Sequence, residues 1–151
     1  MKKFKLTSEF IVDISGVKLF RIKALIEFGN VKAGDLGGYI EKEENLSHMG
    51  DAWVFGDARV SGNARVSGDA QVSGDARVSG DKDYAYAHGF GSCNRTTTFF
   101  RLKDGDVGVR CGCFYGTLAQ FRDKVCETHG ETKKAQEYLM LADLMEIRFK
   151  N

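Results

Sequence analysis

The stretch "DAWVFGDARVSGNARVSGDAQVSGDARVSG", residues 51–80, consists of five near-copies of one six-residue phrase, D/N-A-x-V-x-G. A period of six fits neither a 3.6-residue helix nor a simple two-residue strand sustained over this length. It indicates a solenoid in which each short strand ends at a corner. The Gly-Asp and Gly-Asn pairs are the predicted corners, because these residues tolerate backbone angles that other residues avoid.

Small and β-branched apolar residues alternate with polar ones inside each phrase. The alanine and the valine two positions later point to the same face, since side chains alternate along a strand. We expect these side chains to fill a narrow interior. The alanines are Ala52, Ala58, Ala64, Ala70 and Ala76, and the valines are Val54, Val60, Val66, Val72 and Val78.

These phrases resemble those of the hexapeptide-repeat proteins, whose left-handed β-helix places three phrases around each triangular coil. The resemblance implies a coil of eighteen residues, so that the five phrases make fewer than two coils. In phase with the repeat, Ile40 and Leu46 would take the alanine position upstream, and Tyr84 and Phe90 the valine position downstream. Such a short stack has two open ends, and we expect the flanking segments to cap them.

The flanking sequence predicts β-structure before the repeat, and a hairpin and two helices after it. "FKLTSEFIVDISGVKLFRIKALIEF" (4–28) contains a plausible hairpin turn at Ser15-Gly16, and "TTTFFRLKDGDVGVRCGCF" (96–114) contains another at Asp104-Gly105. Thr117 and Thr132 are the expected N-caps of the helices. The apolar residues expected to be buried are Leu118, Phe121, Val125 and Cys126 in the first helix, and Ala135, Leu139, Ala142, Leu144 and Met145 in the second.

The sequence therefore predicts a mainly β fold, with a short left-handed β-helix between an N-terminal β cap and a C-terminal hairpin with two helices. The predicted regions are 1–33 for the β cap, 34–92 for the solenoid, and 93–151 for the hairpin and helical region.

Composition limits the partners that we expect. The net charge is +1, without the basic excess of proteins that bind DNA or RNA polymers. No apolar run approaches the length of a membrane span. We therefore expect a cytoplasmic protein without a membrane partner, whose four cysteines are free thiols.

The cysteine pair in "VGVRCGCF" raises the question of a metal site. Val107, Val109, Cys111 and Cys113 alternate, which predicts that both thiols lie on the apolar face of a strand. A C-x-C pair without a second pair is a weak zinc signal. We predict buried, inert thiols, with no metal and no cofactor.

The whole chain resembles a group of phage- and prophage-encoded hexapeptide-repeat proteins. The resemblance rests on "KAGDLGGYIEKEENLS" (32–47), "VFGDARVSGNARVSG" (54–68), "NRTTTFFRLKDGDVGVRCGCFYGTLAQF" (94–121) and "ETHGETKKAQEYL" (127–139). The group has no established common activity. The resemblance implies an accessory protein of phage origin, located in the host cytoplasm, and the hexapeptide fold implies a homo-oligomer, most plausibly a trimer.

The stretch "GSCNRTTT" (91–98) is the strongest candidate for a ligand site. It concentrates hydroxyl, amide and guanidinium donors that suit a phosphate or another anion, although it lacks the order of a P-loop. The predicted ligand-binding residues here are Ser92, Asn94, Arg95, Thr96, Thr97 and Thr98, with His88 nearby. Two alternatives stay open: the stretch is a polar connector that caps strands, or His88 is the base of an acyltransferase.

Two further features of the repeat surface indicate function. Arg59 and Arg77 are eighteen residues apart, so both should lie on one face and repel each other unless Asp57, Asp75 or a bound anion intervenes. Trp53 and Phe55 occupy outward positions, and exposed aromatic side chains on a rigid coil indicate an interface. We expect a subunit contact there first and base stacking second.

The resulting hypothesis is a non-enzymatic binding protein that captures a small phosphorylated molecule or nucleotide. In a phage setting, such a protein could sequester a nucleotide signal of host antiviral defence. The alternatives are a hexapeptide-type acyltransferase and a structural or protein-inhibiting module that binds a host defence protein.

Overall fold

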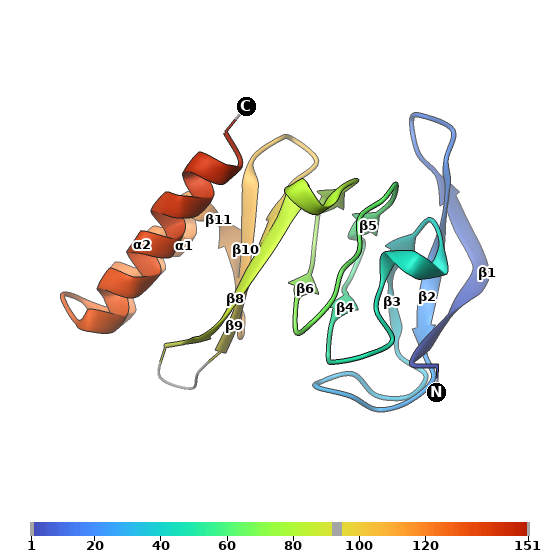
Figure 1. Ribbon diagram of the computed structural model, residues 1–151, viewed down its shortest axis with the longest axis horizontal. Coiled ribbons are helices and arrows are strands. Elements are labelled where there is room, and N and C mark those ends of the chain that lie inside the picture. The colour runs from blue at the N-terminus through green and yellow to red at the C-terminus, as the bar shows by residue number, and fades with distance from the viewer. Residues whose placement is uncertain (1, 92–94, 151) are drawn as a thin grey trace.

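The computed structural model describes residues 2–91 and 95–150, which form three layers (Figure 1). A β-hairpin and a solenoid come first, an antiparallel sheet follows, and two helices cover the far side of that sheet. The prediction of a mainly β fold with two helices is confirmed. In the described part of the chain, no helix combines the length and the apolarity that crossing a membrane requires.

Short parallel strands stack to build the solenoid. One side consists of β3 (Leu36–Ile40), β5 (Arg59–Val60) and β7 (Arg77–Val78), and a second of β4 (Trp53–Val54) and β6 (Gln71–Val72). Val54 pairs with Val72 and Val60 with Val78, so the coil of eighteen residues is confirmed. The repeat alanines and valines are all buried and fill the interior, as predicted. The left-handed sense of the coil stays a prediction.

The first coil is two residues longer than the repeat predicts. Ile40 pairs with Val60 and Leu46 bridges to Val66, so both occupy the valine position and the predicted alanine position is wrong. Leu46 and Val54 are eight residues apart instead of six, which places the extra residues around His48. The His48 ring stacks on Phe4 at 4.3 Å between centroids. The insertion therefore joins the first coil to the N-terminal strand.

The solenoid ends after β7, and the predicted downstream extension is wrong. Tyr84 and Phe90 belong to β8 (Tyr84–Phe90), which runs antiparallel to β9 (Arg95–Arg101). The phrase D-A-x-V-x-G is lost after Gly80, and a short 3₁₀ turn at Asp81–Asp83 replaces the next strand. Asp83 accepts hydrogen bonds from the N–H and the hydroxyl of Ser79, both at 3.0 Å, and these bonds end the coil.

The four-stranded sheet closes one end of the solenoid. Its order is β11 (Phe114–Thr117), β10 (Val107–Cys111), β9 and β8. Within the solenoid, backbone N–H groups donate to carbonyls of the next coil, as Phe55 N–H does to Val72 O at 2.8 Å. No further coil follows the last one, so side chains of the sheet accept hydrogen bonds from its backbone N–H groups. Gln71 N–H donates to Thr98 Oγ1 at 2.9 Å, and Asp75 N–H to Tyr115 Oη at 3.1 Å.

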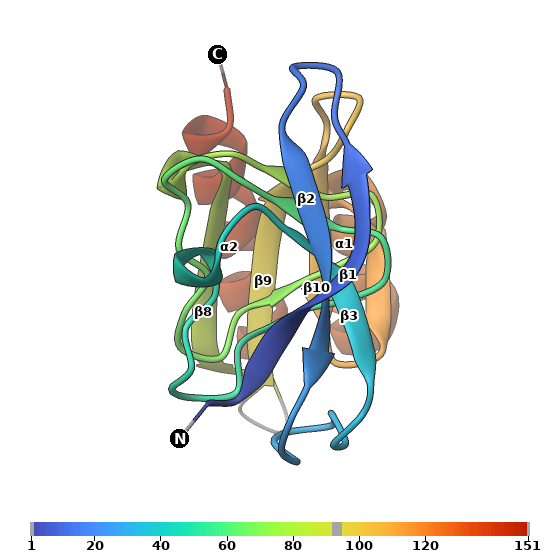
Figure 2. The same cartoon turned by 90° about the vertical axis from the view of Figure 1, so that its right-hand side faces the viewer.

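The N-terminal hairpin closes the other end. Its strands are β1 (Phe4–Val12) and β2 (Lys18–Ala24), and β2 pairs antiparallel with β3 of the first coil. Viewed from this end, the hairpin crosses the coils, and the sheet and helices lie behind them (Figure 2).

A buried lysine just before β1 also contacts the first coil. Lys3 is 1 % exposed, and its Nζ donates to Ala52 O at 2.7 Å and to Gly50 O at 3.3 Å. Burial lowers the Lys3 pKa to about 8, although Asp51 and Asp69 act in the opposite direction.

The helices α1 (Leu118–His129) and α2 (Lys133–Arg148) cover the outer face of the sheet. Thr117 and Thr132 accept hydrogen bonds from Gln120 N–H and Ala135 N–H, so both predicted N-caps are confirmed. The predicted burial is only partly right. Leu118, Phe121, Val125, Ala135, Ala142 and Met145 are buried, Leu139 is half-buried, and Cys126 and Leu144 are exposed because α1 and α2 turn these positions to solvent.

Replacing Thr98 by Val should destabilise the protein by about 1 kcal/mol, because the half-buried backbone N–H of Gln71 loses its acceptor. Urea unfolding of the Thr98→Val variant checks this value. Thr128→Val is the matched control, since Thr128 is exposed on α1 and should change the free energy of unfolding little. A Thr98→Val protein as stable as the parent would contradict the capping role.

Lys3 predicts a specific pH dependence of stability. The unfolded chain titrates lysine near a pKa of about 10.4, whereas the folded-state pKa of Lys3 is about 8. Between these two values the unfolded chain binds more protons, so this group makes the free energy of unfolding rise with pH. Urea unfolding across this window should show a steeper rise for the parent than for Lys3→Met. Parallel pH profiles of the two proteins would contradict the lowered pKa.

Candidate functional site

The predicted ligand-binding residues lie in two separate grooves. Arg59 and Arg77 lie on β5 and β7, whereas His88 lies on β8 and Arg95 and Thr96 on β9. We call the first the arginine groove; it is lined by Asp13, Ile14, Leu19, Arg59, Ser61, Arg77, Val78, Ser79 and Lys103. We call the second the histidine groove; it is lined by Gly29, Asn30, Val31, Asp51, Phe55, Asp69, Gln71, His88, Arg95, Thr96 and Gly112. Ser92 and Asn94 fall outside the described residues.

Thr97 and Thr98 have structural contacts. Both are fully buried. Thr97 Oγ1 donates to Cys111 Sγ at 3.3 Å, and Thr98 Oγ1 accepts from Gln71 N–H. The prediction that these two threonines contact a ligand is wrong, because β9 is an inner strand between the solenoid and the helices. These two residues instead fit the alternative prediction for this stretch, in which its polar side chains cap strands.

The contacts of His88 do not form a catalytic relay. Its Nδ1 lies 2.7 Å from Thr96 Oγ1 and 3.9 Å from Asp69 Oδ2. In a hydroxyl–histidine–carboxylate relay, the hydroxyl and the carboxylate contact opposite ring nitrogens. Here both contacts involve the same nitrogen, so among residues 2–91 and 95–150 the arrangement orients the imidazole ring without linking a base to an activated hydroxyl.

Charges of both signs line the histidine groove, which has a volume of about 270 Å³. Arg95 brings a positive charge to the lining. Asp51 and Asp69 occupy equivalent positions of successive coils, eighteen residues apart. The two carboxylates would repel a multiply charged anion, so this groove favours a ligand that also offers hydrogen-bond donors.

Trp53 and Phe55 do not form the exposed pair that the repeat predicts. Trp53 is 1 % exposed, and its ring meets the rings of Phe28 and Phe4 at 5.3 and 6.4 Å between centroids. It points out of the coil, as expected, but the N-terminal cap covers it. Phe55 is half-buried, with the Arg110 guanidinium 4.3 Å from its ring centroid. Homo-oligomerisation stays a prediction, and Trp53 is not available for a subunit contact.

The two arginines of the arginine groove lie side by side. Arg59 and Arg77 are paired in register on adjacent parallel strands, as predicted. Arg59 Nε is buried and has no hydrogen-bond partner among the described residues. Burial and the neighbouring charge of Arg59 lower the Arg77 pKa, although Asp75 and Asp57 oppose that shift. Burial and the repulsion from Arg59 together therefore outweigh the opposing effect of the aspartates on Arg77.

Other polar groups complete the arginine groove, which has a volume of about 340 Å³. Lys103 brings a third positive charge from the β9–β10 turn, and its Nζ lies 4.0 Å from Asp75 Oδ2 in an exposed, weak pair. Ser61 and Ser79 contribute hydroxyls. Asp13 is the acidic residue of the lining, and its Oδ1 already accepts two backbone N–H groups of its own turn. The positive charges exceed the negative ones by two.

The two cysteines of the C-x-C pair lie in different environments. Cys111 is buried, whereas Cys113 is exposed, which contradicts the prediction for the second thiol. The reason is that β10 ends at Cys111 and Gly112, with φ of 59°, turns the chain. Within residues 2–91 and 95–150, no group of three or more His, Cys, Asp or Glu side chains is arranged to hold a metal ion.

Sequence reasoning missed several residues of the grooves, among them Asp51, Asp69 and Lys103. Asp51 and Asp69 follow the same eighteen-residue spacing as the arginines, and that spacing could have revealed them. Lys103 carries no such signal, because its position depends on the docking of the β9–β10 hairpin on the solenoid. Its backbone N–H donates to Asp75 O at 3.0 Å.

Comparison with known proteins supports the repeat architecture. A family model described as "YdcK Beta solenoid repeat" matches residues 58–70 and 70–81. No curated protein matches the chain. A phage origin stays a prediction. The matched segments span β5, β6 and β7, so this part of the chain is similar to a known β-solenoid repeat.

Proposed function

We propose that the chain is a non-enzymatic binding protein that captures a small phosphorylated ligand in the arginine groove. One observation carries the proposal: Arg59 Nε is buried, has no hydrogen-bond partner in the described part of the chain, and belongs to a side chain beside a second arginine whose pKa is lowered. A buried donor without an acceptor costs stability. A bound anion would supply that acceptor and reduce the repulsion between the two guanidinium groups.

The donors of the groove suit a phosphate group. Adjacent strands are about 4.8 Å apart, so two stacked guanidinium groups can each meet oxygens of one phosphate or of two linked phosphates. Lys103 adds a mobile point charge at the edge, and Ser61 adds a neutral donor. Hydrogen bonds between charged partners are roughly twice as strong as neutral ones. The volume of about 340 Å³ is at the small end of ligand sites, which favours a mononucleotide or a smaller phosphate ester.

The histidine groove supports this function less well, because two carboxylates, those of Asp51 and Asp69, line it together with Arg95. The geometry of His88 likewise gives the acyltransferase alternative little support. A nucleotide is the ligand class to test first. Sequestration of a nucleotide signal used in host defence is the extension that the resemblance to phage proteins suggests.

Replacing Arg77 by Ala should weaken phosphate-ester binding about 10- to 100-fold, the range for losing a hydrogen bond to a charged group. Isothermal titration with pyrophosphate and with nucleoside mono- and diphosphates measures this effect. Arg65→Ala is the matched control, because Arg65 occupies the equivalent repeat position on another face and is exposed. If none of these compounds binds the parent, or both variants bind equally well, the proposal is wrong.

Arg59 should be unfavourable for stability in the unliganded protein. Replacing Arg59 by Met keeps most of the side-chain stem but removes the unpartnered Nε and the charge beside Arg77. We expect the free energy of unfolding to rise by about 1 kcal/mol without ligand, while phosphate-ester affinity falls. Thermal unfolding with and without pyrophosphate tests both parts. A Met variant that is clearly less stable than the parent would show that Arg59 has a supporting role instead.

A further inference from the structure

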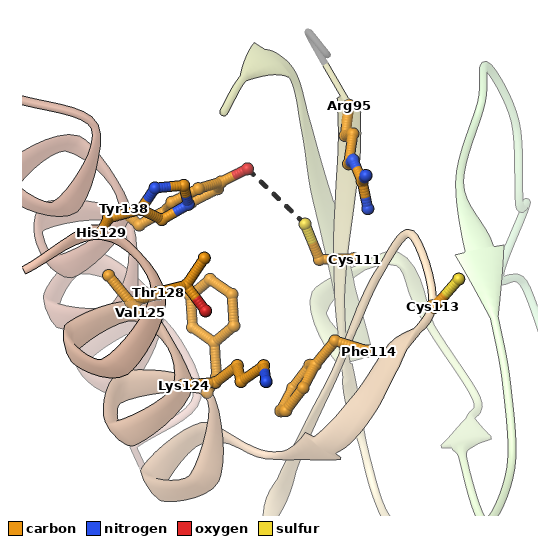
Figure 3. Close-up of a pocket in the computed structure, with 10 residues that line it drawn as sticks. Arg95, Cys111, Cys113, Phe114, Lys124, Val125, Thr128, His129 and Tyr138 are labelled. Carbon is orange, nitrogen blue, oxygen red and sulfur yellow. Dashed lines mark hydrogen bonds between the residues drawn. The ribbon is translucent and has the colours of Figure 1, made fainter. Parts of the chain in front are cut away.

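A third cavity, of about 240 Å³, lies between α1 and the end of the β10–β11 hairpin (Figure 3). Its walls are the side chains of Phe114, Phe121, Val125 and Tyr138, and we call it the aromatic pocket. Phe121 contacts the rings of Phe114 and Tyr138 at 5.8 and 5.5 Å between centroids. Three rings fixed by one another present a rigid, mainly apolar surface.

The floor of the aromatic pocket carries no charge. Cys111 Sγ and Tyr138 Oη are 3.6 Å apart, and Thr97 Oγ1 donates to the same sulfur. Burial raises the pKa of Tyr138, so its phenol stays protonated at neutral pH. The polar atoms at the floor therefore contact one another. An apolar ligand group suits this depth, because the polar atoms there already contact one another and a charged group would have to give up its hydration.

The mouth of the pocket is cationic. Figure 3 shows Arg95 and Lys124 at opposite sides of the cavity, with Cys113 near the hairpin turn. Lys124 Nζ lies 3.8 Å from Glu127 Oε1, and both side chains are largely exposed. Such a surface pair contributes little, so an incoming carboxylate can compete for the ammonium group.

We propose that the aromatic pocket binds a small aryl carboxylate, with its ring among Phe114, Phe121 and Tyr138 and its carboxylate at Lys124. An apolar cavity of about 150 Å³ is enough for benzene. A volume of 240 Å³ therefore accommodates one aromatic ring with a short acid side chain. Ring–ring contacts and apolar burial hold the deep part, and the charge at the mouth sets the orientation.

This site is separate from the arginine groove, because no lining residue is common to the two. Its ligand differs too, since the pocket is mainly apolar and its floor has no charged donor for a phosphate. Binding of an aryl carboxylate in the aromatic pocket is therefore independent of phosphate binding in the arginine groove.

Phenylacetate is the probe, titrated into the full-length ¹⁵N-labelled protein and followed by amide chemical shifts. We expect saturable shifts at residues around the pocket, with a Kd on the order of 0.1–1 mM for so small a ligand. Lys124→Ala should weaken binding about three- to tenfold, whereas the control Lys134→Ala, on exposed α2 surface, should not. Phenylacetamide, which keeps the ring but lacks the charge, should bind more weakly than phenylacetate.

A second variant tests the location of the ligand. Thr128 is exposed on α1 and lines the pocket, so Thr128→Phe should occupy the cavity without disturbing the buried core. We expect this variant to lose phenylacetate binding while its pyrophosphate titration matches that of the parent. The inference is overturned if phenylacetate causes no saturable shifts, if phenylacetamide binds equally well, or if Thr128→Phe binds phenylacetate like the parent.

Discussion

A parallel solenoid with so few coils leaves unpaired backbone groups at both ends, and the rest of the chain satisfies them. Each repeat strand is only two residues long, so a coil depends on its neighbours for most of its hydrogen bonds. The last coil donates to Thr98 and Tyr115 of the sheet, and the first coil accepts from Lys3. A buried backbone group without a partner costs about 1–3 kcal/mol, so several of them would exceed the stability of a small domain. The capping segments are therefore part of the repeat fold.

The same caps shape the surface of the solenoid. The β9–β10 hairpin docks on the last coil through the hydrogen bond between Lys103 N–H and Asp75 O, which brings the Lys103 ammonium group beside Arg77. From the other end, the β1–β2 turn brings Asp13 to the same groove. A groove lined by both caps and the repeat would link the proposed ligand binding to the closure of both ends. Ligand binding there should accordingly stabilise the fold as a whole.

The sequence predicts the features that depend on local chemistry or on the period of the repeat. The alternating Ala and Val residues predict which side chains fill the interior of the solenoid. Gly105 predicts the β9–β10 hairpin, and Thr117 predicts the start of α1. The spacing of Arg59 and Arg77 predicts that the two residues pair on adjacent strands. The packing of segments that lie far apart in the sequence cannot be predicted from such local patterns. The burial of Trp53 depends on an N-terminal cap that folds over it, and the burial of Thr97 and Thr98 depends on β9 becoming an inner strand.

The regular coil between unlike ends also makes length an adjustable property of this architecture. Residues 57–74 form one full turn of eighteen residues, and the residues of one turn pair in register with those eighteen positions later. Duplicating that segment would add a turn without creating a new kind of end. A third guanidinium group would then join the row at about 4.8 Å from its neighbour. In an array of this kind, each duplication of eighteen codons in the gene would lengthen the row of stacked arginines by one.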